Sequence, residues 1–236
     1  MPQRLLLLLC AALLAVPAHA ERLSADLEPG FIQTYRKLAV KILRGNDGDT
    51  QFIGTGFAWV ESGRVLTVTN FHVAQKGLPA DPGTLGLQVG FAAPVNWHTA
   101  TRVLGVPGAD LAIIETDVVA PQERPYELGV AELNEEVYSI SYDQVDFRQA
   151  SPVVYKGRVM GIVGALFPSS ELLIKPPVPP DAVKVYVVDG SDCVPGASGS
   201  MMLNSRGQVF AYNAGRIDNG YCIAVGIEEV LRALAR

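Results

Sequence analysis

The sequence predicts an all-β protein, either a barrel or a sandwich of short strands. Apolar residues recur with a period of two, or in short apolar runs, and each segment ends at residues with turn chemistry. About twelve such segments follow one another at close spacing, which is typical of all-β barrels and sandwiches. Helical periodicity is confined to a weak candidate at residues 31–38 and a stronger one at residues 227–236.

Each predicted strand is bounded by Gly, Pro, Asn, Asp or Ser, the residues that favour turns. The predicted strands are residues 37–44, 51–60, 64–71, 84–92, 99–106, 111–119, 135–142, 152–163, 182–190, 200–204, 208–215 and 221–227. The proline-rich stretch at residues 175–181 is interpreted as an irregular surface loop, because strands continue on both sides of it.

Residues 1–20 have the pattern of a secretory signal peptide. Arg4 supplies a positive charge, residues 5–16 are apolar, and Ala18-His19-Ala20 forms a small-x-small cleavage site. The apolar run is too short to cross a bilayer, although an uncleaved anchor is the alternative interpretation. We therefore expect an exported chain, periplasmic or secreted, that begins at Glu21 and has no stable membrane insertion after cleavage.

The composition indicates an ordinary globular protein. With 236 residues and 49% hydrophobic residues, the chain can bury a substantial core. Its net charge of −5 argues against binding to nucleic acid, which favours a basic surface.

Two cysteines, Cys193 and Cys222, remain after cleavage of the signal peptide. An even number of cysteines in an oxidising compartment predicts a disulfide, and a bridge would close a loop of about 30 residues, worth about 3–4 kcal/mol. Two buried free thiols are the alternative. A metal site is not expected, because the cysteines and the two remaining histidines, His72 and His98, lack ligand spacing. No cofactor is expected either.

The segment SDCVPGASGSMML, residues 191–203, makes Ser198 a candidate nucleophile. A serine hydroxyl needs a base to take its proton, and His72 follows a predicted strand where it could serve. Asp110 could orient that histidine. The structural alternatives are a small turn residue for Ser198, a hydrogen-bonded core residue for His72 and a turn cap for Asp110. His98 is interpreted as a surface or edge-strand residue.

Three motifs resemble those of the chymotrypsin-like (trypsin-like) serine proteases. They are GTGF followed by TNFHV (residues 54–57 and 69–73), DLAI (residues 110–113) and PGASGS (residues 195–200). Their order and spacing suit this family, and the resemblance covers nearly the whole chain after the signal peptide. The SGS form and the terminal helix are most similar to the bacterial glutamyl endopeptidases and related secreted branches.

The resemblance implies a serine-type endopeptidase built from two packed six-stranded antiparallel β-barrels with a C-terminal helix. The barrels would span residues 21–122 and 123–236 and form one peptidase domain, with the catalytic groove between them. His72, Asp110 and Ser198 would form the catalytic triad. The backbone N–H groups of Gly196 and Ser198 would form the oxyanion hole. The substrates would be proteins or peptides, cleaved through an acyl-enzyme.

The resemblance also implies a substrate pocket between residues 190–194 and the strand after the nucleophile. The predicted substrate-binding residues are Ser191, Asp192, Tyr212, Asn213, Ala214 and Gly215. An inward Asp192 would favour Lys or Arg, whereas an inward Ser191 would favour a neutral residue. Tyr212 stands where glutamyl-specific relatives have histidine, which argues against glutamate preference.

The chain departs from the animal digestive relatives just before the nucleophile. Those relatives have aspartate there to pair with a new N-terminus, whereas this chain has Ala197. The zymogen switch of those relatives is therefore unavailable here. Separately, the main alternative function is a protease-like module that keeps the triad but binds peptides or a partner without cleaving them. An esterase is a weaker alternative, because the nucleophile turn lies between two strands.

Overall fold

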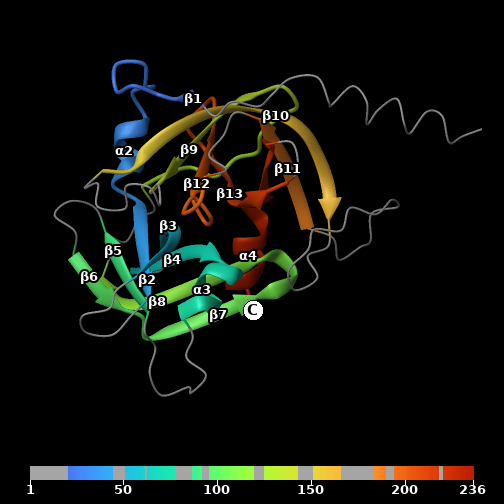
Figure 1. Cartoon of the computed structure of the whole chain (residues 1–236). Helices are drawn as coiled ribbons and strands as arrows, with labels where there is room; N and C mark the ends of the chain where they lie inside the picture. The colour runs from blue at the N-terminus through green and yellow to red at the C-terminus, as the bar shows by residue number, and fades with distance from the viewer. Residues whose placement is uncertain are drawn as a thin grey trace, which may run out of the picture.

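The computed structural model describes residues 21–44, 51–61, 63–77, 87–91, 96–119, 125–142, 151–165, 183–189, 194–217 and 220–236. Strands dominate these residues, and they form two antiparallel sheets with a few short helices (Figure 1). The all-β prediction is therefore confirmed. The predicted signal peptide lies outside the described residues.

The first sheet contains seven strands in the order β6-β5-β2-β3-β4-β8-β7. Its strands are β2 (Ala39–Arg44), β3 (Gln51–Glu61), β4 (Arg64–Asn70), β5 (Leu87–Phe91), β6 (Asn96–Thr99), β7 (Arg102–Val106) and β8 (Leu111–Val119). Within the described residues, β6 and β7 do not pair with each other, so this sheet is a half-barrel. The predicted two-barrel architecture is therefore present, with this first barrel open between β6 and β7. The two edge strands of this sheet are β6, which is mostly exposed, and β7, which is only partly buried. Neither strand buries much surface against the other.

The second sheet closes into a six-stranded barrel, as predicted, because β9 pairs with both β10 and β12. Its strands are β9 (Glu136–Ser141), β10 (Val153–Ala165), β11 (Val183–Asp189), β12 (Met201–Asn204), β13 (Val209–Arg216) and β14 (Cys222–Gly226). The long β10 bends at an irregularity between Val159 and Gly161, which lets its first half pair with β9 and its second half with β11.

The N-terminal segment packs on this second barrel. The two-residue strand β1 (Glu21–Arg22) pairs with β10. Next along the chain, the Phe31 ring meets Tyr138 edge to face, with 5.8 Å between ring centroids. Tyr35 donates a hydrogen bond to the carbonyl of Gly207. The predicted barrel boundary at residue 122 lies outside the described residues, and the chain before β2 is associated with the C-terminal barrel.

The helices are short. They are α2 (Ile32–Arg36), α3 (Phe71–Gly77), the 3-10 turn η1 (Pro107–Ala109) and α4 (Glu228–Leu234). The two predicted helices are thus present as α2 and α4, whereas α3 was not predicted. Among the described residues, no helix has the length and apolar character needed to span a membrane.

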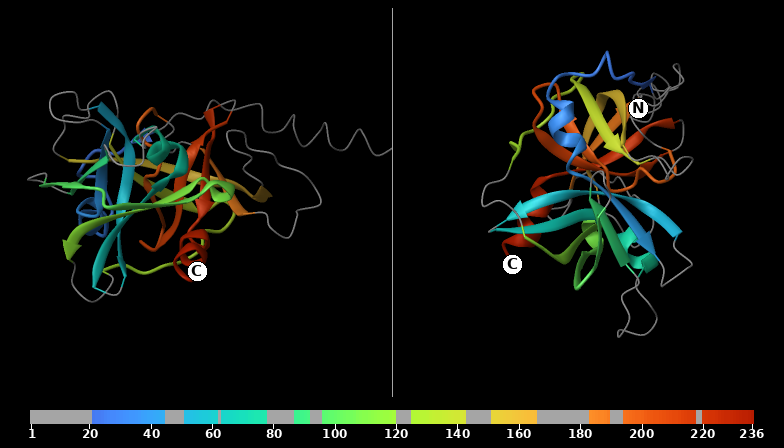
Figure 2. Two further views of the ribbon diagram at one scale, coloured as in Figure 1. Left: turned by 90° about the horizontal axis from the view of Figure 1, so that it is seen from below. Right: turned by 90° about the vertical axis from the view of Figure 1, so that its left-hand side faces the viewer.

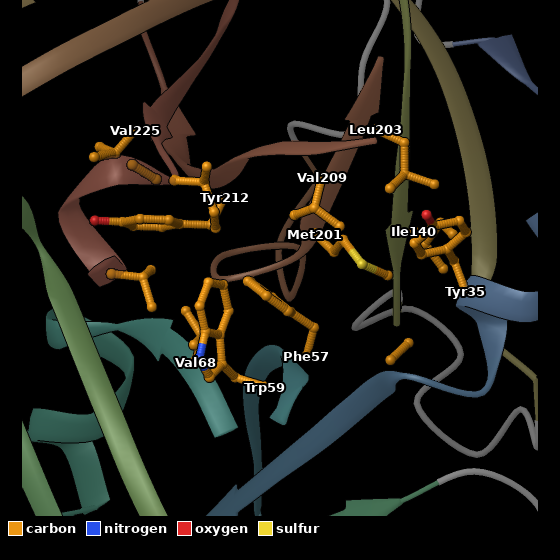
Figure 3. Packing of buried hydrophobic residues seen from close by; sticks show 14 of the residues in the cluster. Tyr35, Phe57, Trp59, Val68, Ile140, Met201, Leu203, Val209, Tyr212 and Val225 are labelled. Carbon is orange, nitrogen blue, oxygen red and sulfur yellow. The ribbon is translucent and has the colours of Figure 1, made fainter. Parts of the chain in front are cut away.

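One shared core joins the two sheets. Phe57, Trp59 and Val68 from the first sheet are almost fully buried together with Met201 and Tyr212 from the second (Figure 3). Each large apolar side chain buried in this way contributes about 1.5–3 kcal/mol relative to an exposed one. Figure 2 shows the two sheets stacked on each other. The predicted catalytic residues come from both sides of this contact.

Candidate active site

His72 lies in the first turn of α3, directly after β4. Asn70 ends the strand fully buried, and the Phe71 ring packs against the backbone of Gly105 on β7. A Cβ atom at Gly105 would overlap that ring, so the absence of a side chain there allows the close approach. This packing fixes the start of α3. The His72 side chain, by contrast, is 40% exposed.

Asp110 follows the η1 turn with a left-handed backbone, φ +45°, a conformation that aspartate tolerates better than most residues. Its carbonyl accepts hydrogen bonds from the Phe71 N–H at 3.0 Å and from Asn70 Nδ2 at 3.2 Å. Its carboxylate accepts one from the His72 N–H, with 3.0 Å between Oδ1 and N. The residues before and at His72 thus hold both ends of Asp110.

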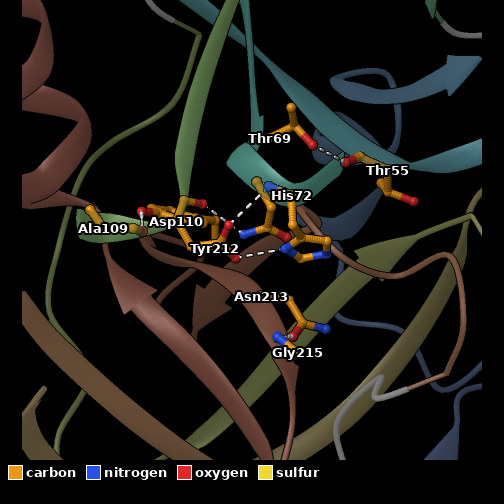
Figure 4. A network of polar contacts seen from close by, with 9 residues as sticks. Thr55, Thr69, His72, Ala109, Asp110, Tyr212, Asn213 and Gly215 are labelled. Carbon is orange, nitrogen blue, oxygen red and sulfur yellow. Dashed lines mark hydrogen bonds and ion pairs between the residues drawn. The ribbon is translucent and has the colours of Figure 1, made fainter. Parts of the chain in front are cut away.

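The remaining carboxylate oxygen of Asp110 meets the histidine ring. Oδ2 lies 2.8 Å from His72 Nδ1 (Figure 4). A carboxylate at Nδ1 favours the tautomer that carries its proton there, which leaves Nε2 as a base. The Asp110 side chain is only 14% exposed, so little water competes for this hydrogen bond. The structure therefore brings two of the three predicted catalytic residues into contact.

Ser198 lies in the turn before β12, and backbone hydrogen bonds hold this turn between β3 and β13. The Ser198 carbonyl accepts from the Thr55 N–H at 3.0 Å, and the Gly199 N–H donates to the Asn213 carbonyl at 2.8 Å. Gly199 has φ +85°, and a Cβ atom there would overlap the Thr55 carbonyl and the Thr69 hydroxyl. Glycine is therefore required directly after Ser198.

Gly54 shows how closely the Ser198 and His72 segments approach. A Cβ atom on Gly54 would lie 2.8 Å from the Val73 side chain and 3.3 Å from the Ser198 carbonyl. Val73 is the residue after His72. The backbone of Ser198 and the α3 helix therefore meet at the same glycine of β3.

The two predicted oxyanion donors lie in this turn. Gly196 has φ +100°, a conformation that favours glycine. Neither the Gly196 N–H nor the Ser198 N–H donates a hydrogen bond to any residue that the structure describes. Among the described residues, neither donor therefore has an acceptor.

The predicted substrate pocket is described in part. Ser191, Asp192 and Cys193 lie outside the described residues. On β13, the side chain of Asn213 is buried and its Oδ1 accepts from the Gly215 N–H at 3.1 Å. Ala214 is buried, and no atom of the described residues lies within 4 Å of a Cβ position at Gly215.

Tyr212 has a different place from the one we predicted. Its side chain is fully buried in the shared core, and its hydroxyl donates to the Ala109 carbonyl at 2.7 Å. Burial, together with the nearby charge of Asp110, raises the pKa of Tyr212 well above its ordinary value. Its side chain therefore supports the Asp110 turn and has no exposed surface with which to contact a substrate.

Sequence reasoning did not identify Thr55 as part of the site. Its hydroxyl donates to the Gly196 carbonyl at 2.8 Å and accepts from the Tyr142 N–H at 3.0 Å. The GTG motif at residues 54–56 was the available signal, but nothing local indicates that the threonine faces the nucleophile turn. His98, as predicted, lies on the edge strand β6, 3.0 Å from Asp117.

Cys222 lies fully buried on β14, while the predicted partner Cys193 is outside the described residues. In the part of the chain that the structure describes, no three His, Cys, Asp or Glu side chains lie close enough to hold a metal ion.

Comparisons with known proteins agree with this fold. The chain matches the family model of the trypsin-like peptidase domain over residues 54–211. No curated protein sequence matches it. The MamO protease domain from Magnetospirillum magneticum has 15% identity and a TM-score of 0.65, covering 85% of this chain and 97% of that chain.

Two further solved structures are similar over most of their length. The Rv3671c protease from M. tuberculosis, in its active form, has 19% identity and a TM-score of 0.65, covering 93% of this chain and 90% of that one. Deg5 has 22% identity and a TM-score of 0.65, covering 88% and 94%. At these identities the structures establish the fold, and the family model spans more than half of the chain. The chain therefore belongs to the trypsin-like peptidase domain family.

Proposed function

We propose that this chain is an exported serine endopeptidase with His72, Asp110 and Ser198 as its catalytic triad. The observation that carries the proposal is the His72 Nδ1 to Asp110 Oδ2 contact of 2.8 Å, next to a serine turn whose N–H donors at Gly196 and Ser198 are open. Membership in the peptidase family supports the same conclusion.

The proposed reaction begins when Nε2 of His72 takes the proton of the Ser198 hydroxyl as Oγ attacks the peptide carbonyl carbon. The carbonyl oxygen becomes an oxyanion that accepts from the N–H groups of Gly196 and Ser198. His72 then gives its proton to the leaving amine as the C–N bond breaks. Water, deprotonated by the same nitrogen, hydrolyses the acyl-enzyme. Asp110 stabilises the imidazolium in both steps.

The proposed substrate site uses the C-terminal end of β13, where Gly215 and Arg216 are not buried. Gly215 has open space beside it, so the backbone of an extended peptide could pair with this strand. The Cys193–Cys222 bridge would fasten the segment before the nucleophile to β14, and reducing agent should then weaken activity before it unfolds the barrels. Export would follow from the signal peptide predicted at residues 1–20.

Labelling with a fluorophosphonate probe tests the proposal directly. The purified mature chain should become covalently labelled, and Ser198→Ala should not. Cleavage of a peptide library by the same sample should require Ser198 as well. A folded chain that binds peptides without being labelled or cleaving them would instead support the binding-module alternative.

A further inference from the structure

Thr55 on β3 is fully buried, and all of its polar groups point to the active-site segments. Its hydroxyl donates to the Gly196 carbonyl at 2.8 Å and accepts from the Tyr142 N–H at 3.0 Å, with the Tyr142 carbonyl 3.3 Å away. Its N–H donates to the Ser198 carbonyl. One residue of the first sheet therefore holds two carbonyls of the nucleophile turn.

Its carbonyl completes the connection to the histidine side of the site. It accepts a hydrogen bond of 2.7 Å from the Thr69 hydroxyl (Figure 4). Thr69 lies on β4, three residues before His72. Thr55 thus connects the turn that carries Ser198 with the strand that leads to His72.

Along the nucleophile turn, peptides with both groups hydrogen-bonded alternate with peptides that have a free N–H among the described residues. In the 196–197 peptide, the carbonyl is held by Thr55 and the N–H by the Val194 carbonyl at 3.1 Å. In the 198–199 peptide, the carbonyl is held by Thr55 and the N–H by Asn213. Both groups of each of these two peptides are thus fixed.

The peptide between them has only its carbonyl held, by the Ser200 N–H at 2.9 Å. In a trans peptide the N–H points opposite to the carbonyl, so the Ser198 N–H is directed away from Ser200. The Gly196 N–H lies directly before the 196–197 peptide, whose two groups are both hydrogen-bonded, and it donates to no described residue. The two open donors therefore flank a peptide that Thr55 orients.

The residue before the nucleophile cannot supply this restraint. Ala197 is 1% exposed, and its methyl group offers no hydrogen bond. The Gly196 carbonyl is bonded by one described side chain, that of Thr55. Since Gly196 has φ +100° and the wide conformational freedom of glycine, loss of that bond would let its peptides rotate.

We propose that the Thr55 hydroxyl is a positioning group for the oxyanion hole, which keeps the Gly196 and Ser198 N–H groups directed at the substrate carbonyl. This inference rests on the proposed function, since an oxyanion hole has a role only in acyl transfer. Thr55 acts through the backbone of the turn and does not touch the substrate. Its loss should therefore lower kcat and leave KM nearly unchanged.

The test compares Thr55→Val with Thr55→Ser and with Thr67→Val. Valine keeps the shape of threonine but removes the hydroxyl, whereas serine keeps the hydroxyl. Thr67 is the matched control, because it is buried on β4 and its hydroxyl has no partner among the described residues. Thr55→Ala repeats the deletion without the valine methyl, in case Thr55→Val does not fold.

For peptide-ester hydrolysis we expect Thr55→Val to lower kcat about 10- to 100-fold. This effect is no larger than the fall in kcat that follows removal of an oxyanion donor itself. Thr55→Ser should retain most of the rate, and Thr67→Val all of it. A peptide boronate, which places a negative oxygen in the hole, should lose affinity for Thr55→Val in the same proportion. Unchanged kcat and boronate affinity in a folded Thr55→Val chain would overturn the proposal.

Amide hydrogen exchange provides a readout that does not need activity. The amides of Tyr142 and Ala197 should exchange faster in Thr55→Val than in the wild type or Thr67→Val. The Tyr142 N–H loses its acceptor, and the 196–197 peptide, which carries the Ala197 N–H, is no longer held by Thr55. A wild-type chain that no acylating reagent labels would refute the proposed function alone. Unchanged exchange at both amides would refute the positioning role of the Thr55 hydroxyl, whatever the activity of the variant.

Discussion

The hydroxyl of Tyr212, on β13 of the second barrel, donates a 2.7 Å hydrogen bond to the carbonyl of Ala109, which precedes Asp110 in the η1 turn between β7 and β8. The bond crosses the contact between the two sheets and is fully buried. It supports a turn in which Asp110 has a left-handed backbone. The aspartate that orients His72 is therefore held from the opposite barrel.

Tyr212→Phe should lower kcat about 3- to 10-fold with little change in KM, because the Asp110 turn loses a support and the His72 ring its fixed orientation. The free energy of unfolding should fall by about 1 kcal/mol, the usual value of one buried hydrogen bond. Steady-state kinetics and urea unfolding measure the two effects.

Tyr126→Phe is the control for that variant. Tyr126 is also buried, and its hydroxyl donates to the Ala58 carbonyl at 3.2 Å, away from the catalytic residues. It should lose comparable stability and keep its kcat. Equal losses of kcat in the two variants would show that Tyr212 contributes stability alone.

Stability at alkaline pH should also depend on Tyr212. Its pKa in the folded chain is raised well above 10, while an unfolded tyrosine loses its proton near that value. Above pH 10 the unfolded state therefore binds fewer protons than the folded state, and stability falls by up to about 1.4 kcal/mol per pH unit from this group. The wild type should lose its advantage over Tyr212→Phe as the pH rises above about 10. Parallel unfolding curves across that range would contradict the assignment.

Removal of the triad residues should show that they act as one unit. Ser198→Ala and His72→Ala should each abolish acyl transfer, and the double variant should be little worse than either. Asp110→Asn should lower kcat about 10⁴-fold near neutral pH, because an amide favours the wrong histidine tautomer. His98→Ala, on the edge strand β6, should remain active. Activity in His72→Ala and its loss in His98→Ala would mean that the base is misassigned.

Gly199→Ala should prevent the nucleophile turn from forming. The added methyl would require φ +85° in alanine and would overlap the Thr55 carbonyl and the Thr69 hydroxyl. We expect a loss of about 3 kcal/mol or more, with no labelling by fluorophosphonate even in the folded fraction. Gly30→Ala, where no atom of the described residues lies within 4 Å of the new methyl, should leave stability and labelling unchanged. A stable, fully labelled Gly199→Ala chain would show that the turn differs from this structure.

The sequence was informative about His72 and Asp110 because short local motifs place both residues at strand ends. Their contact follows once β4 and β8 pair, with Asn70 opposite Leu111. Alternation and turn residues predicted an all-β barrel or sandwich, and the resemblance to the serine proteases implied the second barrel. These features depend on patterns that lie within a few residues of each other.

The supporting contacts could not be predicted in the same way. The Thr55 hydroxyl and the Gly196 carbonyl are 141 residues apart, and Tyr212 and Ala109 are 103 apart. In both pairs the acceptor is a backbone carbonyl, which any residue type supplies. The seven-residue α3 helix is too short to show a helical period, and the unpaired edges of the first sheet depend on long-range pairing.

The residue preference of the proposed peptidase should not include glutamate. A glutamate side chain in the pocket needs a positive or donating partner, and Tyr212, at the place of the histidine in glutamyl-specific relatives, is buried with its hydroxyl already bonded. A peptide-library digest read by mass spectrometry should therefore show no preference for glutamate. Cleavage after Lys or Arg that disappears in Asp192→Ser would identify Asp192 as the pocket carboxylate. Cleavage after neutral residues, unchanged in Asp192→Ser, would indicate that Ser191 is the residue that points into the pocket. Strong cleavage after glutamate would contradict a purely supporting role for the Tyr212 hydroxyl.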